Sequence, residues 1–60
     1  MVAPLFVIEA TNPHDTDDIG NPLYWSNEEG WTTSEAADVY TLEEREHSRL
    51  PIDSRWRGIS

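Results

Sequence analysis

Apolar residues in this chain gather in short runs separated by polar stretches. The first run covers residues 5–8, where four consecutive apolar positions are followed by Glu9. A continuous run of this length, rich in β-branched and aromatic residues, is typical of a strand buried on both faces. Pro4 suits the start of such a strand, where a missing N–H costs little. We therefore predict a buried first strand.

Polar residues then dominate positions 11–22, where Asn-Pro occurs twice and Gly20 once. These are turn signals, and the stretch is long for a hairpin connection, so it is a candidate for a functional or a disordered loop. The pattern of residues 23–26 predicts a second strand. Residues 27–30 predict a tight turn leading into Trp31.

Two stretches have the spacing of a helix capping box, in which a hydroxyl and a carboxylate lie three residues apart. The first, at 32–35, predicts a single helical turn through Ala37, followed by a third short strand at 38–41. The second begins at Thr41 and predicts a helix that ends before Pro51. Leu42 and Leu50 share one face of this helix, so we expect it to cover an edge of the sheet.

The predicted fold is therefore α+β: a small three-stranded antiparallel sheet, a short helical turn before the third strand, and one C-terminal helix. The 60 residues contain no cysteine and form one small domain, with a core at 5–51 and an Arg/Trp tail at 52–60. A chain this short has a small stability margin. Trp56, in the tail, either docks onto the core or stands exposed.

Charge is distributed very unevenly along the chain. The net charge is −8, no lysine is present, and the four arginines all lie between positions 45 and 57. Residues 1–44 hold ten of the twelve carboxylates and no arginine. This balance disfavours direct binding to nucleic acid and to anionic membranes, because both require positive charge. We expect a soluble, cytoplasmic protein whose partner carries a basic surface.

The order of motifs resembles that of small proteins encoded by bacteriophages and prophages, over roughly residues 5–51. The matching residues are Tyr24-Trp25-Ser26, Gly30-Trp31, Ala37, Val39-Tyr40-Thr41, Glu44 and Leu50-Pro51. The resemblance implies a strand, a Tyr/Trp strand, a Gly-Trp turn, an Ala-bearing turn, an aromatic third strand and a helix. It also implies a viral origin, and hence a location in the host cytoplasm.

Candidate metal and catalytic patterns are weak. Asp15, Asp17 and Gly20 fit three positions of an EF-hand loop, but Ile19 falls where a fourth should supply an oxygen ligand. No serine lies in a nucleophile motif and no phosphate-binding loop is present. We expect no metal, no cofactor and no enzymatic activity.

Aromatic residues flanked by acids are typical of a protein-binding surface, because binding energy concentrates on Trp, Tyr and Arg. Tyr24 and Trp25 point to opposite faces of their strand, so at least one is expected to lie where a partner or a second copy of the chain can cover it. The predicted binding residues are Tyr24, Trp25, Trp31, Trp56, Asp15, Asp17, Asp18, Glu28 and Glu29.

The favoured hypothesis is a non-enzymatic acidic module that binds and modulates a host protein. One alternative is mimicry of DNA, in which carboxylates occupy phosphate positions on a nucleic-acid-binding protein. The residues available for such an array are Asp15, Asp17, Asp18, Glu28, Glu29, Glu35, Asp38, Glu43 and Glu44. The other alternative is a minor structural component of a virion, in which the acidic residues serve solubility.

Overall fold

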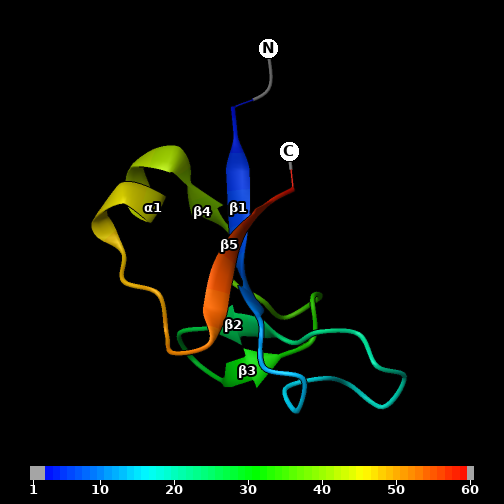
Figure 1. The fold of residues 1–60 in the computed structure, drawn as a ribbon. Helices are drawn as coiled ribbons and strands as arrows, with labels where there is room; N and C mark the ends of the chain where they lie inside the picture. Colours follow the sequence, from blue (N-terminus) through cyan, green and yellow to red (C-terminus); the bar gives the residue numbers. More distant parts are fainter. Residues whose placement is uncertain (1–2, 60) are drawn as a thin grey trace.

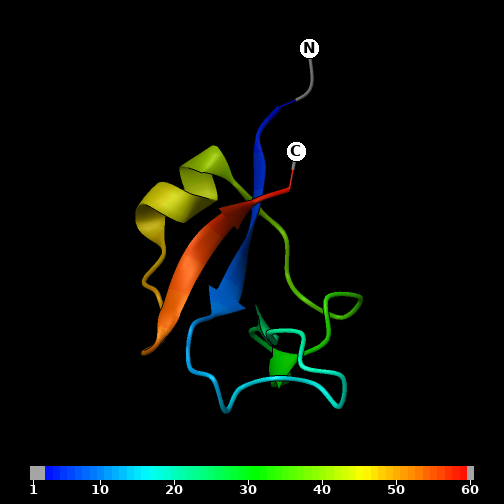
Figure 2. The same ribbon diagram turned by 45° about the vertical axis from the view of Figure 1, so that its right-hand side comes forward.

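The computed structural model describes residues 3–59 and shows an antiparallel sheet with one short helix (Figures 1 and 2). The elements are β1 (Leu5–Ala10), β2 (Tyr24–Ser26), β3 (Gly30–Thr32), β4 (Tyr40–Thr41), α1 (Leu42–His47) and β5 (Ser54–Gly58). The α+β class agrees with the sequence. The predicted three-stranded sheet is wrong, because the sheet has five strands.

Strand β1 is the centre of the sheet and uses both of its edges. On one edge β5 pairs with it from Phe6 to Ala10, and the amide of Ile59 extends this ladder by donating to the carbonyl of Leu5. The other edge is shared by two short strands. β4 pairs near Leu5 and Phe6, and the amide of Ala10 donates to the carbonyl of Leu23 where β2 begins. β3 pairs with β2 farther out.

One face of β1, here called the helix face, carries the apolar core. Phe6 and Ile8 both point to this face, because they are two residues apart in the strand. The pairing register places Tyr40 beside Phe6 and Trp56 beside Ile8. Ile8 is 1% exposed and Tyr40 is also buried. The guanidinium of Arg45 lies 4.6 Å from the centre of the Phe6 ring, which sets α1 on this side.

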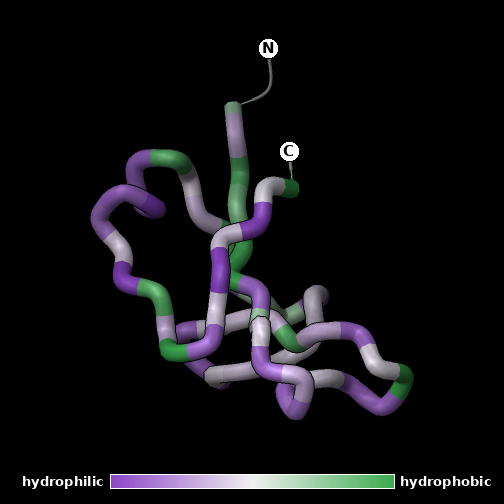
Figure 3. Tube along the Cα trace, in the orientation of Figure 1, coloured by the Kyte–Doolittle hydropathy of each residue, from purple (hydrophilic) through white to green (hydrophobic). Residues whose placement is uncertain are grey.

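The opposite face of β1, here called the Glu9 face, is polar at its centre. Val7 and Glu9 project from it, and the register aligns Arg57 with Val7 and Arg55 with Glu9. Tyr24 joins them from β2. Figure 3 shows that β1 and β5 differ in hydropathy: β1 is largely hydrophobic, and much of β5 is hydrophilic.

Residues 54–58, within the Arg/Trp tail at 52–60, form β5. The physical reason lies on both faces of the strand. Trp56 packs against Tyr40 on the helix face, while Arg55 and Arg57 reach Glu9 on the other. Of the two alternatives for Trp56, the structure shows docking.

At the position of the predicted helical turn the structure has a single hydrogen-bonded turn. Residues 34–36 form a turn in which the amide of Ala36 donates to the carbonyl of Thr33 at 3.1 Å. The second capping box is confirmed, because Thr41 and Glu44 exchange both side-chain to backbone hydrogen bonds. The strand predicted at 38–41 is shorter than expected, because β4 covers only Tyr40–Thr41.

Helix α1 ends at His47 rather than at Leu50. Ser48 has extended backbone angles, and its hydroxyl donates to the carbonyl of Glu44, which closes the last turn. No residue of α1 is buried, so no apolar stripe extends the helix toward Leu50, which is 40% exposed. The expected shared face of Leu42 and Leu50 therefore does not form.

The loop at 11–22 is organised by its own hydrogen bonds. Thr16 and Pro22 form an isolated bridge, and the amide of Leu23 donates to the carbonyl of Asp15. Within the bridge, one oxygen of Asp17 accepts from the amides of Ile19 and Asn21. The loop projects from the end of the sheet that holds β2 and β3 (Figure 1). Nowhere in residues 3–59 does a helix have the length and apolar character needed to cross a membrane.

Candidate functional site

Glu9 is an acidic residue in the most buried strand of the protein. Glu9 is 1% exposed, and its two carboxylate oxygens accept four hydrogen bonds. Arg55 donates through Nε and Nη2 to Oε1 at 2.9 and 2.6 Å. Oε2 accepts from Arg57 Nη1 at 2.6 Å and from the hydroxyl of Tyr24 at 3.2 Å.

The protonation states of this cluster follow from burial and from the arginines. Burial by itself raises the pKa of Glu9, and the hydrogen bonds from Arg57 and Arg55 outweigh it, so the pKa lies below its ordinary value. Burial and the nearby Glu9 charge raise the pKa of Tyr24, which therefore stays protonated and donates. With all its donors in place, Glu9 has no lone pair directed at a substrate. The cluster is a structural ion pair network joining β1, β2 and β5.

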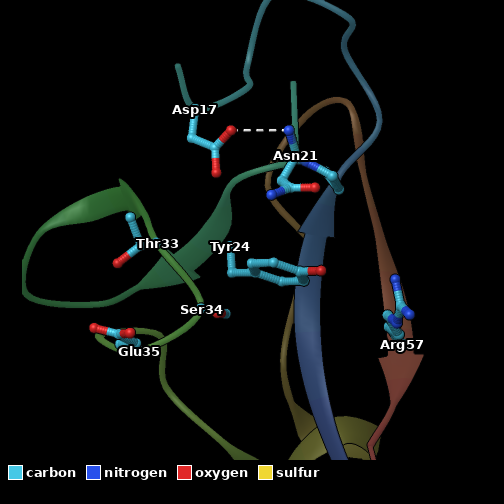
Figure 4. Close-up of a pocket in the computed structure, with 8 residues that line it drawn as sticks. Asp17, Asn21, Tyr24, Thr33, Ser34, Glu35 and Arg57 are labelled. Atoms are coloured by element: carbon cyan, nitrogen blue, oxygen red, sulfur yellow. Dashed lines mark hydrogen bonds between the residues drawn. The ribbon is translucent and has the colours of Figure 1, made fainter. Parts of the chain in front are cut away.

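Two adjoining pockets lie over this cluster on the Glu9 face, and both are lined by Tyr24, Ser34 and Arg57. We call them together the Tyr24 groove. The larger pocket, of about 460 Å³, is polar and is bounded by the 11–22 loop and the turn after β3. Figure 4 shows Tyr24 in its centre, Asp17 on one side, and Thr33 and Glu35 on another. The smaller pocket, of about 250 Å³, is apolar.

The loop acids do not converge on a common point. Asp17 lines the polar pocket, whereas Asp18 is exposed and does not line it, and Asp15 uses its backbone to hold Leu23. A backbone hydrogen bond from Asn21 is the main cause that lowers the pKa of Asp17. Within residues 3–59, no three His, Asp or Glu side chains are arranged to hold a metal ion.

Trp25 and Trp31 form a second candidate surface, at the outer end of the sheet. Their rings meet edge to face with centroids 5.3 Å apart and planes at 79°. Both residues are half-buried. The indole Nε1 of Trp25 donates to Asn27 at 3.0 Å, and a Cβ built on Gly30 would lie 3.9 Å from the Trp25 ring. The backbone of Gly30 is left-handed, with φ 79°, which favours glycine at this turn.

The turn beside this pair carries Glu28 and Glu29, both exposed. Their amides donate to the hydroxyl of buried Ser26 at 3.2 Å. Asp38 fixes the same turn by accepting from the amide of Asn27 at 2.8 Å. We call Trp25, Trp31, Glu28 and Glu29 the Trp–Glu surface.

Seven of the nine predicted binding residues fall into three places, while Asp15 and Asp18 lie in the 11–22 loop outside them. Trp25, Trp31, Glu28 and Glu29 lie together on the Trp–Glu surface, while Tyr24 and Asp17 line the Tyr24 groove. Trp56 is half-buried, and its ring lies 5.2 Å from that of Tyr40 at 80° in the helix-face core.

Three groups of the Glu9 cluster were missing from the predicted site: Glu9, Arg55 and Arg57. One signal in the sequence points to them. A carboxylate at the end of a buried apolar run requires a positive partner, and every arginine lies after position 44. Pairing of the tail with the first strand follows from that requirement.

No protein-family model, curated protein or solved structure matches this chain.

Proposed function

We propose that this chain is a non-enzymatic acidic protein-binding module that binds and modulates a host protein through the Trp–Glu surface. The observation that carries the proposal is the edge-to-face pair of Trp25 and Trp31 beside the exposed carboxylates of Glu28 and Glu29. Interfaces concentrate their binding energy on large aromatic side chains surrounded by a polar rim. The Trp–Glu surface has both parts.

The position of the pair in the sheet supports this role. β3 lies at one end of the strand order β3-β2-β1-β4, so Trp31 stands on a terminal strand. Trp25 is held by Asn27 and by the Ser26-anchored turn, so its ring is fixed before a partner arrives. A preformed aromatic contact loses little conformational entropy on binding.

Electrostatics support a basic partner. The chain has a net charge of −8, and Arg55 and Arg57 direct their guanidinium groups to Glu9. The surface field is therefore dominated by the carboxylates. Such a field accelerates association with a basic surface, and salt screens that effect.

The distribution of the acids favours this proposal over DNA mimicry. The carboxylates belong to the 11–22 loop, the β2–β3 turn, the segment between β3 and β4, and α1. Figure 1 shows the loop and the helix at opposite ends of the molecule. Mimicry requires a continuous row, since duplex DNA carries one charge per about 1.7 Å of axis.

The hydrogen bonds that occupy both carboxylate oxygens of Glu9 support a non-enzymatic role. General acid–base catalysis needs a group within hydrogen-bond reach of a substrate proton. Glu9 has a perturbed pKa, but its oxygens are occupied by Arg55, Arg57 and Tyr24.

The test is affinity capture from a bacterial lysate, followed by kinetics with the purified partner. Trp31→Ala is expected to weaken binding at least about tenfold, as expected for an interface hot spot. Ile52→Ala is the matched control, because Ile52 is an apolar residue 87% exposed outside the Trp–Glu surface.

Raising the salt concentration from low to physiological is expected to slow association of the wild type. Glu28→Gln with Glu29→Gln is expected to reduce that salt dependence. Equal binding by the wild type and Trp31→Ala, or an association rate independent of salt, would contradict the proposal.

A further inference from the structure

The Tyr24 groove joins a polar and an apolar pocket side by side. Tyr24, Ser34 and Arg57 line both, so the two pockets adjoin at these residues. The polar pocket alone, at about 460 Å³, falls within the roughly 300–1,000 Å³ range of ligand sites. The groove does not include the two tryptophans of the Trp–Glu surface.

The polar pocket favours a cation. Its lining contains the carboxylates of Asp17 and Glu35 and one guanidinium, that of Arg57. Arg57 is paired within the protein, with its Nη1 2.6 Å from Oε2 of Glu9. Because Glu9 also pairs with Arg55, these three residues together keep one positive charge, against the two negative charges of Asp17 and Glu35. The charge presented to a ligand is therefore negative.

Only one carboxylate oxygen of Asp17 accepts hydrogen bonds from backbone amides. Its Oδ1 accepts from the amides of Ile19 and Asn21 at 3.0 and 2.9 Å. The other oxygen points into the space above Tyr24 (Figure 4). The loop hydrogen bonds lower the pKa of Asp17, so the carboxylate is charged at neutral pH.

The apolar pocket is lined by Val7, Val39 and Ile59 in addition to the shared residues. Val39 and Ile59 are each 50% exposed, which is high for aliphatic side chains beside a pocket. An aliphatic side chain placed here would remove their surfaces from water, and such burial is favourable at about 25 cal/mol per Å².

We propose that the Tyr24 groove binds an extended segment of a partner protein, with an arginine in the polar pocket and an aliphatic residue two positions away in the apolar pocket. In an extended segment, residues i and i+2 project to the same side about 6.6–6.8 Å apart. This proposal adds a second contact to the proposed function, and it rests on that function for the expectation that the partner is a basic protein. The groove itself is a second contact site.

Arginine fits the polar pocket better than lysine. Its planar guanidinium stacks on an aromatic ring such as that of Tyr24 while donating in its own plane. Asp17 and the hydroxyl of Ser34 provide acceptors at the rim. Lysine has a compact charge that cannot make both kinds of contact equally well.

The experiment is an NMR titration of the ¹⁵N-labelled full chain with acetylated, amidated pentapeptides. The probe is Gly-Arg-Ser-Val-Gly, and the controls replace its arginine by lysine or glutamate, or its valine by serine. The Arg-Ser-Val peptide is expected to shift the amides of Asp17, Tyr24 and Ser34 and to bind more tightly than every control. Equal affinity for the Arg-Ser-Val and Arg-Ser-Ser peptides would overturn the assignment of the apolar pocket.

Asp17→Asn tests the polar pocket while preserving the loop, because the asparagine side chain still has an oxygen to accept from Ile19 and Asn21. It is expected to raise the Kd of the Arg-Ser-Val peptide about tenfold, the effect of losing one hydrogen bond to a charged group. Asp18→Asn is the matched control, since it removes the neighbouring charge without touching the groove. It is expected to change Kd less than about twofold.

Equal effects of Asp17→Asn and Asp18→Asn would overturn the proposal, because they would show attraction by net charge alone. Trp31→Ala separates this proposal from the Trp–Glu surface. It is expected to leave peptide affinity unchanged even where binding of the whole partner is lost.

Discussion

The ring of Trp56 meets the ring of Tyr40 edge to face, with centroids 5.2 Å apart and planes at 80°. The two residues come from β5 and β4, which pair with opposite edges of β1. Their contact therefore spans the central strand on the helix face. The contact therefore joins β4 and β5, which do not pair with each other directly.

Trp56→Ala is accordingly expected to lower the free energy of unfolding by about 3 kcal/mol, the scale for truncating a large aromatic in a core. Trp31→Ala removes an aromatic of the same size from a terminal strand and is expected to cost about 1 kcal/mol. Urea denaturation followed by circular dichroism measures both. If Trp56→Ala does not fold, Trp56→Phe gives the comparison. Equal losses at positions 56 and 31 would contradict the core role of Trp56.

The fold is expected to lose stability in acid through Glu9. Its pKa is 4.5 in an unfolded chain and lower in the fold. The stabilisation is therefore complete above about pH 4.5 and is lost as the pH falls through the folded pKa. Unfolding measured between pH 7 and pH 2 is expected to show this decline.

Glu9→Gln is the control for the acid response. It keeps the shape of the side chain, removes the charge, and is expected to cost about 2 kcal/mol at pH 7. The variant is expected to have a flatter profile in acid. An acid profile of Glu9→Gln as steep as that of the wild type would assign the acid sensitivity to other carboxylates.

Asp53 has left-handed backbone angles, with φ 55°, in the turn that leads into β5. Its carbonyl accepts from the amide of Thr11 at 2.8 Å, so the turn is fixed to the end of β1. Asp53→Val is expected to destabilise the protein by about 1–2 kcal/mol, because β-branched side chains fit this conformation poorly. Asp53→Gly is expected to be tolerated. Thermal unfolding of the two variants measures the difference, and a stable valine variant would contradict it.

The capping box of α1 and the turn at 34–36 give a pair of threonine substitutions to compare. Thr41→Ala removes the side-chain acceptor for the amide of Glu44 and is expected to cost about 1 kcal/mol. Thr33→Ala changes the same residue type in the turn that forms no helix, where the carbonyl rather than the side chain accepts from Ala36. It is expected to change stability by less than about 0.5 kcal/mol. Equal losses in chemical denaturation would argue against the cap.

The elements that were predicted correctly are those with a local cause. The apolar run before Glu9 defines β1, and the reciprocal bonds of Thr41 and Glu44 define the start of α1. The sequence at 32–35 has the same spacing of threonine and glutamate, but Thr32 belongs to β3 and residues 34–36 form only a single turn. Local spacing alone does not decide whether a helix continues.

The two missed strands depend on partners, which for β3 lie across a tight turn and for β5 lie far away in the chain. β3 has three residues, too few for a period to be visible, and it forms because Trp31 packs against Trp25 across the turn. The residues of β5 have the composition of a charged tail. They form a strand because Arg55 and Arg57 bind Glu9, which lies more than forty residues earlier. The Tyr24 groove is lined by Arg57 of β5 and by residues 33–35 after β3, so the sequence predicts only part of its lining.

The pairing of β1 with β5 has a consequence for how the protein is made. The strand synthesised first among the five must wait for the one synthesised last, because its longest ladder and the counter-charges of Glu9 are both on β5. Contacts between distant segments slow folding. The nascent chain therefore emerges with one edge of this apolar strand unpaired, and its native structure closes only when residues 54–58 have left the ribosome.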